Sequence, residues 1–156
     1  MAAKAIPEGY ERATPYLCVQ GASDAIAFYV KAFGAVETSR LAEPGGRIGH
    51  AEIKIGDAPL MLSDEYPEEG VQSPATLGGS PVAIHLYVAD VDALAARAVA
   101  AGAKLTRPIE DQFYGDCSAI LLDPFGHRWF FATRKEDVSV TEMQRRYGAL
   151  MAQETK

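Results

Sequence analysis

Two histidines and one glutamate give this sequence its clearest capacity for chemistry. His50 and Glu52 are two residues apart, so their side chains share one face of a strand. His85 is predicted on the equivalent face of another strand. Imidazole and carboxylate groups bind divalent metals, and a carboxylate beside an imidazole also moves protons. Two hypotheses stay open: a displaced metal site with Glu52 as proton shuttle, or a set of polar anchors for a ligand.

Aromatic residues share these strand faces with the polar groups. In segments 14–19, 82–88 and 128–132, side chains alternate between the two faces of a strand, so these aromatic and polar residues lie on the face opposite the apolar positions. A concave pocket suits such a mixture better than open solvent does. The aromatic side chains expected to stack on a flat ligand are Tyr16, Tyr87 and Phe130. The expected polar anchors are His50, Glu52, His85 and Arg128.

Phe113 and Tyr114 form a second aromatic feature, directly before Gly115. Two aromatic residues beside a glycine hinge suit a lid that closes over a bound molecule. An ordinary loop whose aromatic rings pack on the core fits the same residues. The sequence leaves both interpretations open.

An internal repeat supplies the elements that position these residues. Residues 14–34 and 81–102 each read as an alternating strand followed by a helix. We predict Ser23 and Asp90 as the residues that cap the two helix starts. Gly34 and Gly102 suit the left-handed position after each helix, and they lie 102 − 34 = 68 residues apart.

The repeat continues after each helix with three predicted strands. Those of the first half are 36–41, 50–55 and 59–63, and those of the second half are 104–109, 117–122 and 128–133. The expected fold class is therefore α+β, with two tandem βαβββ modules that form a cupped mixed sheet, plus a C-terminal helix. The expected divisions are a first module over 7–64, a linker over 65–80, a second module over 81–133 and a helical tail over 134–156. Within the tail, Ser139 and Glu142 match a capping box.

Charge and composition exclude several classes of function. The chain has 15 Lys and Arg against 21 Asp and Glu, a formal net charge of −6. An acidic protein repels phosphate backbones, so we expect no nucleic-acid partner. We expect no membrane partner, since no apolar run approaches the length of a bilayer span. The start of the chain has no secretory pattern, and Cys18 and Cys117 have neither metal-ligand nor disulfide-framework spacing. Both features favour a cytoplasmic protein with reduced thiols.

The repeated plan and four segments resemble a known superfamily. The segments are 27–34 (AFYVKAFG), 55–64 (IGDAPLMLSD), 112–116 (QFYGD) and 123–129 (DPFGHRW). They resemble the vicinal oxygen chelate superfamily, which includes glyoxalase I, bleomycin-resistance proteins and extradiol dioxygenases. Segment 112–116 is most similar to its PhnB-like branch. The resemblance covers about residues 7–133 and implies the glyoxalase/bleomycin-resistance fold and a homodimer.

The same resemblance bears on metals and activity. Metal-using members take ligands from the first and last strands of each module. Carried onto this sequence, those positions fall at or near Thr14, Ala83, Phe130 and 60–61, where no metal-binding side chain stands. The resemblance therefore favours a protein that binds a small aromatic or oxygenated molecule without the usual complete metal site. The alternative is a divalent-metal-dependent lyase, isomerase or transferase of the glyoxalase type that uses His50, Glu52 and His85 as a displaced site.

Overall fold

Two four-stranded mixed sheets form the body of the protein. The computed structural model describes residues 3–154. The first sheet contains, in spatial order, β1 (Tyr16–Val19), β4 (Ala58–Asp64), β3 (Ile48–Ile55) and β2 (Val36–Ala42). The second contains β5 (Ala83–Tyr87), β8 (Arg128–Arg134), β7 (Asp116–Leu122) and β6 (Lys104–Asp111). Each sheet comes from one half of the chain, and the predicted α+β fold class is confirmed.

The two sheets repeat the same pairing. In each, the first strand runs parallel to the last, and the remaining pairs are antiparallel. Tyr16 pairs with Met61, which pairs with Glu52. In the second sheet, His85 pairs with Phe130, which pairs with Ile120. These two rows are equivalent positions of the repeat.

One long helix follows the first strand of each sheet. They are α1 (Ala22–Phe33) and α3 (Val91–Ala101), and Gly34 and Gly102 end them with the predicted left-handed backbone. Asp90 caps α3 as predicted, because its side chain accepts a hydrogen bond from the Ala93 amide at 2.9 Å. The prediction for Ser23 is wrong. That residue lies inside α1, whose first amides are bound by Asp64 from the end of β4.

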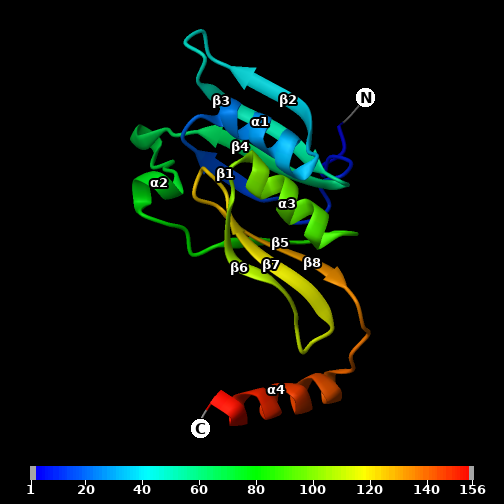
Figure 1. The fold of residues 1–156 in the computed structure, drawn as a ribbon. Helices are drawn as coiled ribbons and strands as arrows, with labels where there is room; N and C mark the ends of the chain where they lie inside the picture. Colours follow the sequence, from blue (N-terminus) through cyan, green and yellow to red (C-terminus); the bar gives the residue numbers. More distant parts are fainter. Residues whose placement is uncertain (1–2, 155–156) are drawn as a thin grey trace.

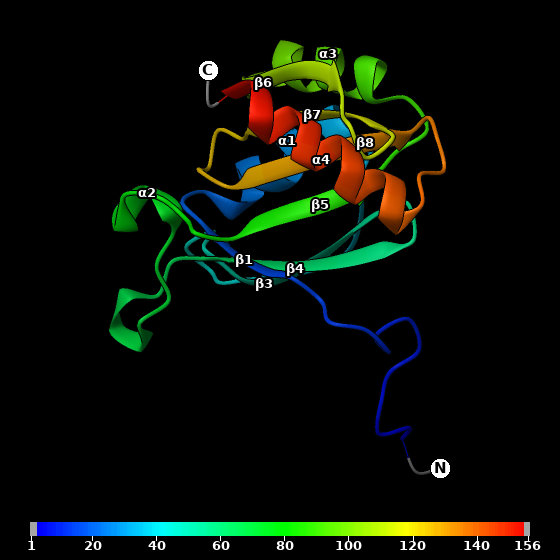
Figure 2. The ribbon, with the colours of Figure 1, turned by 90° about the horizontal axis from the view of Figure 1, so that it is seen from below.

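The two halves share one hydrophobic core. Phe33 of α1 packs on Trp129 and Phe131 of β8, with ring centroids 4.8 and 4.9 Å apart. Tyr29 donates a hydrogen bond to buried Asp123, on the second half, at 2.7 Å. Figures 1 and 2 show α1 and α3 together on the inner side of the two sheets. The helix-facing sides of both sheets are therefore filled, and the opposite sides remain open.

The linker and the tail add three further helical segments. The predicted linker contains a 3-10 turn η1 (Pro67–Glu69) and a short helix α2 (Pro74–Leu77). The tail forms α4 (Val140–Glu154), and Ser139 Oγ accepts from the Glu142 amide at 3.2 Å. The last two residues of the predicted tail lie outside the described part of the chain. Figure 1 shows α4 standing away from the second sheet.

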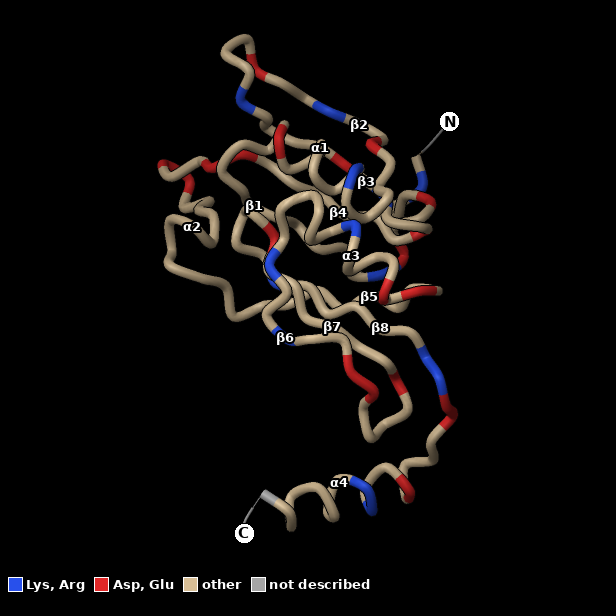
Figure 3. Tube along the Cα trace, viewed as in Figure 1, with Lys and Arg blue, Asp and Glu red and all other residues tan. Residues whose placement is uncertain are grey.

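Charged residues are dispersed over the fold. Over residues 3–154, Figure 3 shows lysine and arginine positions interspersed with acidic ones rather than gathered into a basic stripe. In the same residues, no helix combines the length and the apolar character that crossing a membrane requires.

Candidate functional site

The open side of the first sheet carries a chain of four hydrogen-bonded polar side chains. The Tyr16 hydroxyl lies 2.9 Å from His50 Nδ1, and His50 Nε2 lies 3.2 Å from Glu52 Oε1. Tyr10, on the segment before β1, donates its hydroxyl to Glu52 Oε2. Because an ionised carboxylate only accepts, His50 Nε2–H donates to it, and in that tautomer Nδ1 accepts from the Tyr16 hydroxyl. We call these four residues the Glu52 network.

Hydrogen bonds to the Glu52 carboxylate give the Glu52 network its electrostatic character. The side chains of His50 and Glu52 are 28% and 24% exposed. The hydrogen bond from Tyr10 and then that from His50 lower the pKa of Glu52. The same contact with Glu52 raises the pKa of Tyr10. The network therefore presents an ionised acceptor, Glu52, on a surface that the ring of Tyr16 borders.

The open side of the second sheet carries a different group. His85 stacks on Phe130 with ring centroids 6.3 Å apart, and Tyr87 lies beside His85 at 5.0 Å. The Tyr87 hydroxyl donates to Asp116 Oδ2 at 2.6 Å, and this bond raises the pKa of Tyr87. Asp116 is buried, and within the described chain its Oδ1 has no hydrogen-bond partner. Its counter-charge is Arg134, whose Nε is 3.6 Å away.

Six of the predicted site residues thus fall into two groups on two sheets. His50, Glu52 and Tyr16 meet through hydrogen bonds, and His85, Tyr87 and Phe130 meet through ring contacts. The displaced metal site requires His85 beside His50 and Glu52. Residues 3–154 contain no cluster of three or more His, Cys, Asp or Glu side chains suited to holding a metal ion.

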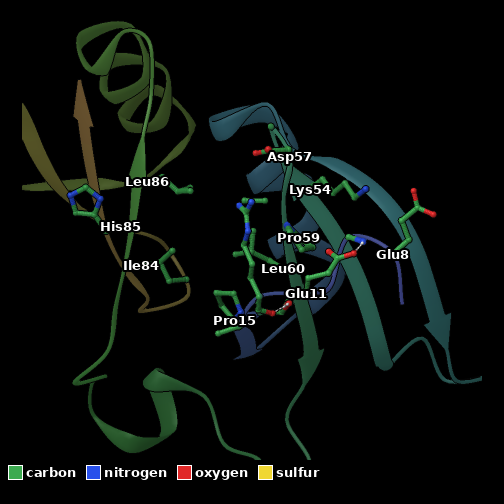
Figure 4. A pocket seen from close by; sticks show the side chains of 16 residues that line it. Glu8, Glu11, Pro15, Lys54, Asp57, Pro59, Leu60, Ile84, His85 and Leu86 are labelled. Carbon is green, nitrogen blue, oxygen red and sulfur yellow. Dashed lines mark hydrogen bonds between the residues drawn. The ribbon is translucent and has the colours of Figure 1, made fainter. Parts of the chain in front are cut away.

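A cavity of about 890 Å³ lies between β5 and the part of the first module that precedes β1 and joins β3 to β4. It is bordered by residues 8–9 and 11–15, by the β3–β4 turn and by one stretch of β5 (Figure 4). Of the predicted site residues, His85 lines it. Lys54 also lines the cavity, and it is two residues from Glu52 on the same face of β3. Gly9 and Glu11, the sequence neighbours of Tyr10, line the cavity as well. The cavity therefore reaches the edge of the Glu52 network, and its volume suits a small organic ligand.

Phe113 and Tyr114 lie in the turn between β6 and β7. Phe113 contacts Tyr147 of α4 at 5.4 Å, and its carbonyl accepts a hydrogen bond from Arg146 at 3.2 Å. A side chain at Gly115 would meet the Glu136 carbonyl at 2.4 Å, so this glycine lets the tail pass close to the turn. The turn is fastened to the tail, and a lid function for it stays a prediction.

Two residues of these groups, Tyr10 and Asp116, are not among the predicted site residues. Tyr10 lies before the first strand, in a segment without periodicity, and reaches Glu52 over 42 positions. Asp116 reads as one more charged residue beside a turn glycine. A polar side chain at the start of an otherwise buried strand is the one signal that marks Asp116.

The fold and the two open faces define a class of protein: small α+β chains of two βαβββ modules. Residues 12–131 match the model of the Glyoxalase/Bleomycin resistance protein/Dioxygenase superfamily. The chain belongs to this superfamily, and the resemblance predicted from the sequence is confirmed at that level.

Relatives of the chain occur in bacteria and a plant. It is 45% identical over 134 residues to the uncharacterized protein Mb0911c of Mycobacterium bovis, covering 84% of this chain and 88% of that protein. It is 30% identical over 123 residues to At5g48480 of Arabidopsis thaliana, covering 74% of each.

Solved structures share the fold. The X-ray structure of At5g48480 matches with a TM-score of 0.64 and 28% identity, over 79% of this chain and 98% of that one. TioX from Micromonospora sp. ML1 matches with a TM-score of 0.63 and 24% identity, over 83% of this chain and 100% of that one. The likeness to TioX shows the fold alone.

Proposed function

We propose that the chain binds a small, flat, hydroxylated molecule at the Glu52 network and in the cavity beside it. The observation that supports this most is the contact between Tyr10 and Glu52. The phenolic hydroxyl of Tyr10 donates a hydrogen bond to the Glu52 carboxylate, so the phenolic hydroxyl of a ligand can donate to the same acceptor. The bond is charge-assisted and therefore stronger than one between neutral groups.

The surroundings of Glu52 favour a planar ligand. Tyr16 is 52% exposed and borders the network with an open ring face, on which a second ring stacks. The cavity of about 890 Å³ adds apolar walls, among them Pro59, Leu60 and Ile84. One charged acceptor beside aromatic and apolar walls fits a ligand that combines a hydroxyl group with a flat hydrocarbon body.

A titration with 4-nitrocatechol, followed by chemical-shift changes, tests this proposal. We expect the shifts to centre on Tyr16, His50 and Glu52, and Glu52→Gln to weaken binding about ten-fold, the loss of one charge-assisted bond. Glu110→Gln is the matched control, since Glu110 is an exposed carboxylate on β6. Shifts that avoid the Glu52 network, or equal affinity of the two variants, would contradict it.

Metal analysis of the purified protein decides between this proposal and the metal-dependent alternative. The contact between His50 and Glu52 is the observation that favours a displaced site. We expect no stoichiometric divalent metal. Bound metal that disappears in His50→Ala or His85→Ala would replace the binding proposal with a metal-dependent enzyme of the glyoxalase type.

We propose a second copy of the chain as a partner. Apolar side chains are exposed on both open sheet faces and on α4, which stands off the body. They are Tyr16, Tyr87, Val140, Tyr147 and Leu150. We expect sedimentation to show a dimer at micromolar concentration and Leu150→Asp to weaken it. A monomeric wild type would contradict the dimer and leave the ligand proposal standing.

We also propose a cytoplasmic location and a place in the PhnB-like branch. Both cysteines are free thiols, one half-buried and one buried, which fits a reducing compartment. The segment 112–116 supports the branch. Fractionation of cells with an antibody to the protein tests the location.

A further inference from the structure

A second cavity lies between the linker and both modules and shares Tyr16 with the Glu52 network. It consists of two hollows of about 280 and 350 Å³, which share four lining residues. These are Pro74, Gly79, Ser80 and Arg128. We call the two hollows together the linker pocket. Strands β1 and β5 and the β7–β8 turn complete its walls.

Hydrogen bonds hold the linker wall of this pocket in place. Glu65 Oε1 accepts from the Ser73 amide at 2.7 Å and from the Thr76 hydroxyl at 2.5 Å. These bonds lower the pKa of Glu65 to about 2. Gln20 donates to the same threonine at 3.0 Å, which ties the linker to the first module. The wall exists without a ligand, which reduces the entropy lost on binding.

A glycine lets the linker lie against the second module. Gly126 has a φ of +90°, and a side chain there would meet Pro74 Cβ at 2.8 Å. The β7–β8 turn therefore approaches α2 closely, and Arg128, two residues further on, lines the pocket.

The charge of the linker pocket differs from that of the whole protein. The chain has a net charge of −6, yet among the residues that the structure describes no carboxylate lines either hollow. Arg128 is exposed, and its guanidinium has no hydrogen bond or ion pair within the described residues. The other titratable groups in the lining are Cys18, Tyr16 and His127, whose Nε2 is 2.9 Å from the Cys18 carbonyl. The pocket offers a fixed positive charge with no internal counter-ion.

Exposed apolar side chains form part of the remaining walls. Leu77 and Val82 are 64% and 66% exposed and line the hollow of about 280 Å³, beside β1 and β5. From these observations we propose that the linker pocket binds an organic carboxylate with an apolar chain. Its carboxylate pairs with Arg128, whose planar guanidinium matches the two oxygens. Its chain covers Leu77 and Val82.

Calorimetric titration of the full-length protein with octanoate tests the proposal. We expect saturable binding that Arg128→Gln weakens about ten-fold or more, as the loss of a charge-assisted pair predicts. Octanamide has the same shape without the charge and should bind the wild type about ten-fold more weakly than octanoate. Arg107→Gln is the matched control, since Arg107 is an exposed arginine of β6 that lines neither hollow.

Each outcome of this titration supports or overturns the proposal. Undiminished octanoate binding in Glu52→Gln separates the linker pocket from the Glu52 network. Absence of saturable binding, equal affinity for octanoate and octanamide, or the same loss in Arg107→Gln would overturn the carboxylate site. The octanamide comparison uses the wild type alone, so it remains decisive even if Arg128→Gln fails to fold.

Discussion

The two modules share one backbone plan and differ on their open faces. One cross-strand row of the first module consists of Tyr16, Met61 and Glu52. The equivalent row of the second module consists of His85, Phe130 and Ile120. Glu52, at one end of the first row, therefore corresponds to the buried Ile120 of the second row. Side chains that build the fold recur in both modules, whereas the Glu52 network occurs on the first module. The difference teaches that the repeat predicts architecture and leaves the placement of chemistry to each module.

The modules also differ at the turns that precede their last strands, and this contrast carries the largest expected effect. Asp123, before β8, accepts hydrogen bonds from Tyr29, Trp129 and two backbone amides. Asp57, before β4, is exposed. We expect Asp123→Ala to lower the free energy of unfolding by about 3 kcal/mol or more, since several buried donors lose their acceptor. Asp57→Ala should change it by less than about 0.5 kcal/mol.

Urea unfolding followed by tryptophan fluorescence and by circular dichroism measures both variants. Because the modules share one core, we expect a single transition with both probes. Two separate transitions in the wild type would mean that the modules unfold independently.

Helix capping gives the next contrast. Asp64 accepts from three backbone amides, those of Gly21, Ala22 and Ile48. Its counterpart Thr133 accepts from one, that of Val91, at 2.9 Å. We expect Asp64→Ala to cost about 2 kcal/mol and Thr133→Ala about 1 kcal/mol of unfolding free energy. Denaturant midpoints in the reverse order would break the proposed equivalence of these two caps.

Acid should affect the first open face through Glu52. Hydrogen bonds from Tyr10 and His50 lower the pKa of Glu52 in the folded protein. The ionised carboxylate therefore stabilises the fold at pH values above the pKa of Glu52 in the unfolded chain, and this stabilisation is lost as the pH falls through the pKa of Glu52 in the folded protein. Between about pH 5 and pH 3, the wild type should lose more stability than Glu52→Gln. The difference should be below about 1 kcal/mol, because the side chain is partly exposed. Urea midpoints across this range, with Glu110→Gln as control, measure it; parallel curves would contradict the assignment.

The smallest expected effect is at Ser23. Its hydroxyl accepts from exposed Arg40 at 3.0 Å and does not cap α1. We expect Ser23→Ala to change the unfolding free energy by less than about 0.5 kcal/mol, against about 1 kcal/mol for Asp90→Ala. Equal costs in thermal or urea unfolding would mean that both helices rely on local caps.

The sequence predicts local features well because their causes are local. Strand alternation and the two glycines after the helices give the elements to within about two residues at most ends. Side chains that act across the fold escape such reasoning. Asp64 caps a helix 42 positions earlier, and Tyr10 reaches Glu52 over the same separation. The faces of His50 and His85 were predictable from period two, but the angle between the sheets depends on the shared core around Phe33 and Trp129.

The parallel pairing of first and last strands also sets a constraint on synthesis. Tyr16 pairs with Met61 and Ala83 with Arg128, so each module closes over 61 − 16 = 45 and 128 − 83 = 45 positions. Neither sheet is complete until its last strand has left the ribosome, and such distant pairing slows folding. The first module must then wait for Trp129 to cover Phe33. During that interval the nascent chain exposes an apolar helix face, which raises its risk of aggregation at that stage of translation.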